Sequence, residues 1–159
     1  MENWFHKITD FLNHPLFPIA KWIIGKTSPA LRRLINGLDR RKIAIFAKGD
    51  NLTSLKDLLK DLKLFSDEDI IAITGMGDTG RAEKATVFLV YWSDWKDDIK
   101  AILDKTLDTT PLVVYAPQEL GSIPPDAIKA LNTKRHCVIA NFRGRLLNDI
   151  VLSMITTSR

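Results

Sequence analysis

The stretch Thr86-Val87-Phe88-Leu89-Val90-Tyr91-Trp92 is the most hydrophobic run of the chain, and it decides the fold class. An uninterrupted apolar run, without alternating polar residues, indicates a strand that is covered on both faces, as in a parallel sheet. Short apolar runs of the same kind lie on either side of it, at residues 42–47, 69–74, 111–116 and 136–141. We therefore predict a parallel sheet of five strands.

Segments with helical spacing of apolar residues separate these runs, so that strand and helix alternate through residues 42–159. Leucines from Leu52 to Leu62 line one face of the first helix, and residues 81–85 leave room for only about one turn. Further helices are expected at 95–107, from Pro124 onward and at 145–156. This rhythm with right-handed crossovers favours a three-layer α/β sandwich with the flavodoxin-like strand order 2-1-3-4-5.

Residues 1–41 differ from this domain and are expected to form an amphipathic, basic helical appendage. Eight basic and three acidic residues lie within 1–42, which leaves the remainder of the chain nearly neutral although the whole carries a net charge of +4. A neutral domain argues against nucleic acid as a partner. The appendage either lies on an anionic membrane surface or packs on the domain, on a second copy or on another protein. Its candidate contact residues are Trp4, Phe5, Phe11, Trp22, Arg32 and Arg33.

Two kinds of feature that the sequence lacks limit where the protein can be located and which catalytic chemistry it can carry out. No apolar run approaches the roughly 20 residues needed to cross a bilayer, and the start of the chain lacks a basic signal-peptide region. We therefore expect a cytoplasmic protein. If the appendage binds the membrane, the protein would be held at its inner face. Cys137 is the only cysteine and lies in an apolar run, and the histidines His6, His14 and His136 are too scattered to suggest a catalytic triad.

Ligands of such sheets bind beyond the carboxyl ends of the strands, at the point where strand order reverses, here between the first and third strands. The loops expected there hold most of the domain's polar candidates, and two arginines follow the last strand where a helix N-terminus would favour an anion. The candidate ligand-binding residues are Lys48, Asp50, Asn51, Gly75, Gly77, Gly80, Arg81, Ser93, Asp94, Trp95, Arg143 and Arg145.

The segment Gly75-Met76-Gly77-Asp78-Thr79-Gly80 matches G-x-G-x-x-G, but it follows the second strand and precedes too short a helix for a dinucleotide site. Asp78 would also repel a phosphate, so the segment is interpreted as a flexible glycine loop, or as a lid or partner-binding loop in which Arg81 contacts an anion. Flavin could stack on Trp92, Trp95 or Tyr115, but the loop after the first strand lacks a hydroxyl-rich phosphate cradle. No metal and no cofactor is expected, apart from a nucleotide-like ligand.

The run from Ala85 to Trp95, with an apolar third strand ending in Ser93 and a Ser-x-Trp opening the next helix, resembles TIR domains. This resemblance covers the first three strands and implies signalling through self-association. TIR enzymes that cleave NAD carry a glutamate in that helix, where this chain has Asp97 and Asp98. The leading hypothesis is therefore a non-catalytic signalling or adaptor module that self-associates. The alternative is a sensor of a nucleotide-like ligand, or an NAD-cleaving enzyme of the TIR type.

Overall fold

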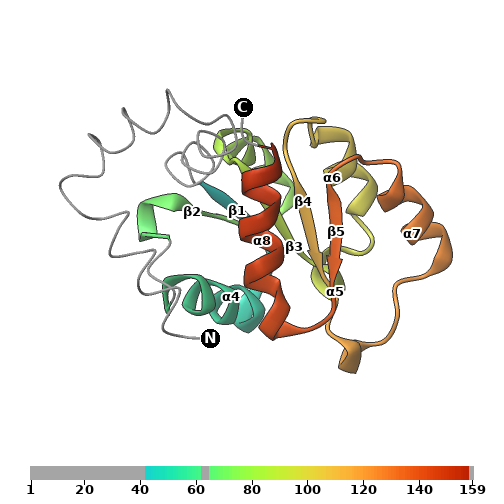
Figure 1. Cartoon of the computed structure of the whole chain (residues 1–159), viewed down its shortest axis with the longest axis horizontal. Helices are drawn as coiled ribbons and strands as arrows, with labels where there is room; N and C mark the ends of the chain where they lie inside the picture. The colour runs from blue at the N-terminus through green and yellow to red at the C-terminus, as the bar shows by residue number, and fades with distance from the viewer. Residues whose placement is uncertain (1–41, 62–64, 158–159) are drawn as a thin grey trace, which may run out of the picture.

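The computed structural model describes residues 42–61 and 65–157, which form an α/β domain around one sheet (Figure 1). The appendage predicted for residues 1–41, with its contact residues from Trp4 to Arg33, lies outside the described residues. None of the helices in the described ranges is long and apolar enough to cross a membrane.

The predicted sheet is confirmed, with five parallel strands in the order β2-β1-β3-β4-β5. Strand β3 pairs with β1 on one side and with β4 on the other, so its apolar run lies near the centre of the sheet. The strands are β1 (Ile43–Phe46), β2 (Ile70–Ile73), β3 (Val87–Tyr91), β4 (Leu112–Tyr115) and β5 (Cys137–Ala140).

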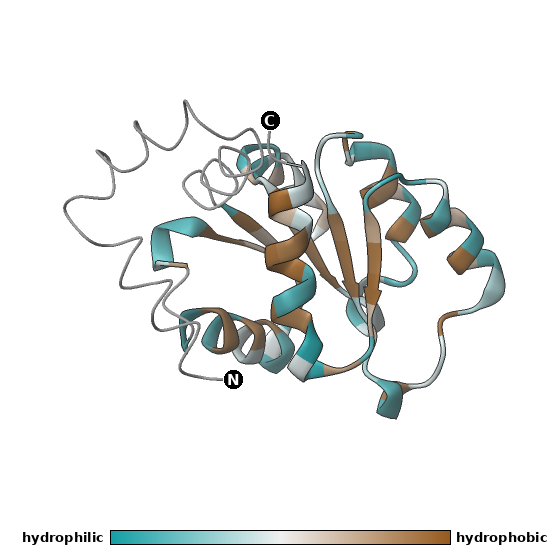
Figure 2. Ribbon diagram, viewed as in Figure 1, coloured by the Kyte–Doolittle hydropathy of each residue, from teal (hydrophilic) through white to brown (hydrophobic). Residues whose placement is uncertain are grey.

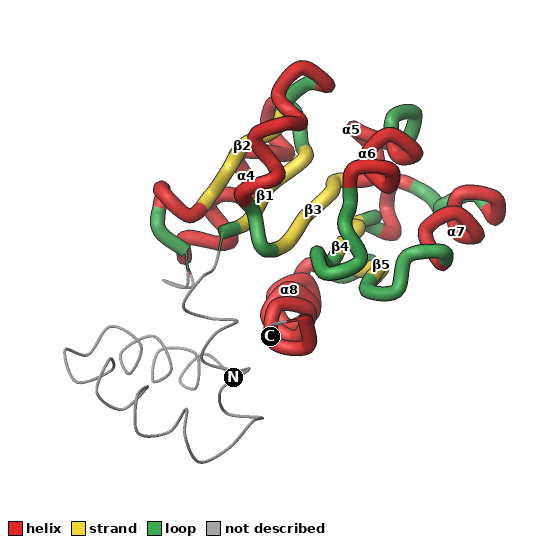
Figure 3. Tube along the Cα trace, turned by 90° about the horizontal axis from the view of Figure 1, so that it is seen from above, coloured by secondary structure: helices red, strands yellow, loops and turns green. Residues whose placement is uncertain are grey.

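Helices cover both faces of the sheet, which explains why the strands are apolar throughout (Figures 2 and 3). Helices α4 (Gly49–Asp61) and α8 (Arg143–Thr157) pack on the face of Ile45, Leu89 and Val113. The other face, with Phe46, Phe88 and Val114, is covered by η2 (Met76–Lys84), α5 (Trp92–Trp95), α6 (Ile99–Lys105) and α7 (Pro125–Asn132). Two short 3-10 helices, η1 (Asp67–Asp69) and η3 (Gln118–Leu120), complete the described elements.

Three of the predicted helices differ from the structure in their bounds or type. The helix expected at 95–107 is present only as α6, because Asp98 adopts a non-helical conformation as its N-cap, and the short helix α5 precedes it. Aspartate favours caps over helix interiors, so Asp98 begins α6, whereas α5 has already ended at Trp95. The turn expected at 81–85 is instead a 3-10 helix that begins at Met76. The last helix begins at Arg143, which is earlier than predicted and places both candidate arginines in its first turn.

Substitution of Leu89 tests how much the stability of the sheet depends on strand β3. Its side chain is fully buried on the face that α4 and α8 cover, and β3 pairs with β1 and β4. We expect Leu89→Ala to lower the free energy of unfolding by about 2–5 kcal/mol, since it leaves a cavity in a closely packed core. Leu107→Ala is the matched control, because Leu107 is 67% exposed and its loss should change stability by less than about 0.5 kcal/mol. Urea denaturation of both variants measures the difference, and equal losses would contradict the described core.

Candidate functional site

Asp94 joins the carboxyl ends of β1 and β3, the two strands between which strand order reverses. Its carboxylate accepts a hydrogen bond of 2.7 Å from the backbone N–H of Lys48 and one of 3.0 Å from the side-chain amide of Asn51. Gly49 follows with a φ of +51°, a left-handed conformation that lets the chain turn from β1 into α4. The structure thus brings together Lys48, Asn51 and Asp94, three of the residues predicted from the sequence.

These contacts also engage the groups that would otherwise bind a phosphate in this crevice. The Lys48 ammonium lies over the Trp95 ring, 5.0 Å from its centroid. Trp95 is itself buried against Phe46, on the face of the sheet that η2, α5, α6 and α7 cover. The backbone N–H of Lys48 is taken by Asp94. The junction between β1 and β3 is therefore a structural clamp, and space for a ligand lies beside it.

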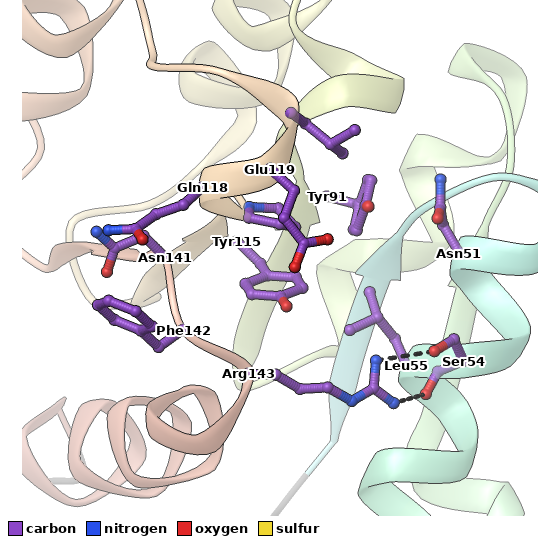
Figure 4. Close-up of a pocket in the computed structure, with 12 residues that line it drawn as sticks. Asn51, Ser54, Leu55, Tyr91, Tyr115, Gln118, Glu119, Asn141, Phe142 and Arg143 are labelled. Carbon is purple, nitrogen blue, oxygen red and sulfur yellow. Dashed lines mark hydrogen bonds between the residues drawn. The ribbon is translucent and has the colours of Figure 1, made fainter.

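A cavity of about 440 Å³ opens beside this clamp, at the carboxyl edge of the sheet and on the face of α4 and α8 (Figure 4). It lies between the first turns of α4, the ends of β3 and β4, η3 and the connection from β5 to α8. Its lining combines aromatic rings, amide side chains and two charged groups. The lining residues are Asn51, Ser54, Leu55, Tyr91, Tyr115, Pro117, Gln118, Glu119, Leu120, Asn141, Phe142 and Arg143.

Tyr91 and Tyr115 form the floor of this cavity as the last residues of β3 and β4. They are paired in the sheet register, and their rings meet edge to face with centroids 5.7 Å apart. Burial raises the pKa of both hydroxyls above the ordinary 10.0. The Asp94 carboxylate raises the pKa of Tyr91 further, whereas Arg143 lowers the pKa of Tyr115. Both hydroxyls are therefore neutral near pH 7.

Arg143 closes one side of the cavity by connecting the first turn of α8 to α4 (Figure 4). Its guanidinium donates to the Ser54 hydroxyl at 2.8 Å and to the Ser54 carbonyl oxygen at 3.0 Å. Arg145, the second arginine predicted for an anion pocket, does not line the cavity and lies 3.7 Å from Asp149 within α8. The two arginines therefore do not converge on one site.

The remaining predicted residues lie apart from the cavity. Gly75, Gly77, Gly80 and Arg81 belong to η2 or precede it directly, and η2 packs on the opposite face of the sheet. Neither they nor Asp50 and Ser93 belong to the lining of the cavity. The glycine-rich segment and the crevice residues thus do not form one site in this structure.

Sequence reasoning identified Arg143 at the start of α8 but missed the side of the cavity that η3 provides. Gln118 and Glu119 of η3, and Asn141 and Phe142 after β5, were not among the candidate ligand contacts. One signal was available, because Tyr91 and Tyr115 end neighbouring strands at equivalent positions and so reach the same edge on the same face. The position of η3 depends on a turn with Gly121 at a φ of +91°, which no strand or helix pattern reveals.

The described residues hold no cluster of histidine, cysteine, aspartate and glutamate that would bind a metal ion. Cys137 lies half-buried on β5, and burial raises its pKa to about 11, so its thiol stays protonated near neutral pH. No protein-family model, curated protein or solved structure matches this chain. The resemblance to TIR domains therefore stays a prediction, and the cavity has to be interpreted from its own chemistry.

Titration of the tyrosines tests the floor of the cavity, because Tyr91 and Tyr115 are the only two in the chain. We expect both to ionise above pH 10 in the folded protein, since burial disfavours the phenolate. The folded state then holds these protons more tightly than the unfolded chain, so the free energy of unfolding falls as the pH rises from about 10 through the folded-state pKa values. Ultraviolet absorbance of tyrosinate measures the titration, with the denatured chain as control. Coincident curves for the folded and denatured protein would show that the rings are not buried as described.

Proposed function

We propose that this domain is a non-catalytic module that binds a small ligand in the cavity at the carboxyl edge of its sheet. The observation that carries the proposal is the cavity itself, which lies beside the reversal of strand order where parallel α/β sheets bind ligands. Its volume of about 440 Å³ falls within the range of small-molecule sites. Aromatic walls with a few polar groups are also typical of such sites.

The chemistry of the lining argues against catalysis at this place. Among the residues that line the cavity, Glu119 is the only carboxylate, so general acid–base chemistry by a pair of carboxylates is excluded. Tyr91 and Tyr115 are held in the protonated form by burial and are poor bases near pH 7. These groups are suited to orienting a ligand by hydrogen bonds and ring contacts.

A cavity-filling variant tests this proposal whatever the chemical class of the ligand. Gln118 is exposed at the rim, so Gln118→Trp should cover part of the cavity without disturbing the core. We expect compounds from a mixed library of nucleotides, amino acids, sugars and amines to perturb the amide NMR signals of Tyr91, Tyr115 and Asn141 in the full-length protein. Gln118→Trp should weaken such binding at least about tenfold, which corresponds to a loss of roughly 1.4 kcal/mol.

Lys100→Trp is the matched control, because Lys100 is exposed on α6 and does not line the cavity. This variant should bind library compounds as the unchanged protein does. Absence of any perturbation at the cavity, or equal losses in the two variants, would overturn the proposal of a ligand-binding module.

A second proposed function, self-association as a signalling or adaptor module, is supported by apolar side chains around the same edge. Leu120 and Phe142 are 57% and 51% exposed, and Ile139 is 38% exposed on the edge strand β5. A second cavity of about 300 Å³ adjoins Ile139, with mostly apolar lining from Ala116, Ile123 and Ile128. Exposed apolar surface beside an unpaired strand edge favours contact with another copy of the chain.

Phe142→Asp tests this second function by placing a charge within the exposed apolar surface. We expect it to raise the dissociation constant for self-association at least about tenfold, because an aspartate would have to lose its water in the interface. Leu107→Asp is the control, since Leu107 is also exposed but lies in the connection between α6 and β4. Light scattering coupled to size-exclusion chromatography over a range of concentrations provides the measurement. A monomer at every concentration would exclude self-association.

A further inference from the structure

Glu119 and Arg143 carry opposite charges and line the same cavity, yet they do not form an ion pair with each other. Glu119 belongs to η3, whereas Arg143 begins α8. In Figure 4 the Glu119 carboxylate points into the cavity above Tyr115, and Arg143 enters from below toward Ser54. The cavity therefore has a negative side and a positive side with open space between them.

The Glu119 carboxylate is free to accept hydrogen bonds from a ligand. Within residues 42–61 and 65–157, it takes part in no ion pair and accepts no hydrogen bond. In Figure 4 it points into the space that the rings of Tyr91 and Tyr115 also line. An unpaired carboxylate beside aromatic rings suits an ammonium group, which is attracted both by the charge and by the faces of the rings.

Arg143 retains capacity to bind an anion although it contacts Ser54. The two hydrogen bonds to Ser54 use two of the five N–H donors of a guanidinium and fix its position. The first turns of α4 and α8 lie on this side of the cavity, and helix N-termini carry partial positive charge. A carboxylate would therefore be favoured next to Arg143.

The charges of Glu119 and Arg143 both affect the two tyrosines on the floor of the cavity. Besides burial, Glu119 raises the pKa of both Tyr91 and Tyr115, and Arg143 lowers the pKa of both. Both charged groups line the same cavity as the two tyrosines, so one small molecule on that floor can contact all of them. The amides of Asn51, Gln118 and Asn141 line the walls, and amides act as donors and as acceptors.

We propose that the ligand of this cavity is a small zwitterion, an amino acid or short peptide, whose ammonium group faces Glu119 and whose carboxylate faces Arg143. This inference rests on the proposed ligand-binding function and names its ligand class. An apolar or aromatic side group would lie against Tyr91, Tyr115 and Phe142. A nucleotide fits less well, because Arg143 is the one cationic side chain among the lining residues, and Lys48 and Arg145 are engaged elsewhere.

The test compares charge forms of one molecule on the full-length protein. The probes are the proteinogenic amino acids and their dipeptides, followed by the amide and the N-acetyl derivative of the tightest binder, with AMP and a simple amine as references. Isothermal titration calorimetry should show the zwitterion binding at least about tenfold more tightly than either derivative, because each derivative loses one charge-assisted contact.

Charge variants assign the two sides of the site. Glu119→Gln should weaken the zwitterion and its amide at least about tenfold but leave the N-acetyl derivative unchanged. Arg143→Gln should weaken the zwitterion and its N-acetyl derivative but leave the amide unchanged. Arg143→Lys, which keeps the charge, should retain part of the affinity for the zwitterion. The matched controls are Asp126→Asn and Arg135→Gln, because both residues are exposed and neither lines the cavity.

Two outcomes would overturn the ligand class while leaving the proposed function intact. One is binding of nucleotides, sugars or amines at the cavity with no response to amino acids or dipeptides. The other is zwitterion binding that is unaffected by both Glu119→Gln and Arg143→Gln. If no compound perturbs the cavity at all, the ligand-binding function itself fails.

Discussion

The burial of parallel strands on both faces is the constraint on which this structure depends. Strands β1, β3 and β4 are buried along their whole length, so each needs helices above and below it. The connections must therefore cross from one end of the sheet to the other, and all five strands point the same way. The consequence for function is that loops from distant parts of the chain lie together at one edge of the sheet, where Tyr91 and Tyr115 end their strands.

Asp94 determines where the open space lies at this edge of the sheet. At a reversal of strand order the two connections leave toward opposite faces, which opens a crevice between them. Asp94 spans that crevice by binding the backbone of Lys48 and the side chain of Asn51, so the junction is filled by the protein's own contacts. The open space lies on the face of α4 and α8, where Arg143 and Ser54 hold the two helices at a fixed separation.

The sequence predicted the sheet well because a buried parallel strand has a local signature, a run of apolar residues without alternation. Helix boundaries were harder, since Asp98 had to be recognised as a cap and not as part of a continuous helix. The site was predicted only in part. Of the predicted residues, Asn51 and Arg143 line the cavity, and Lys48 and Asp94 form the clamp beside it. Gln118, Glu119 and Asn141 instead depend on how two loops fold against each other. No periodic pattern in the chain encodes that contact. The pairing of Arg145 with Asp149, in contrast, follows from their spacing of four residues on one helix.

The bridge between Arg143 and Ser54 has a mechanical consequence. Helix α8 begins at the cavity and runs back past the sheet toward the edge at which β1 starts (Figure 1), a length of roughly 22 Å for its 15 residues. Leu146, Ile150 and Met154 are buried against the sheet along this length, so α8 is anchored from its first turn to its last. The bridge to Ser54 therefore joins the mouth of the cavity to the packing of the whole face, and the spacing of its walls is set by the core and not by the loops alone.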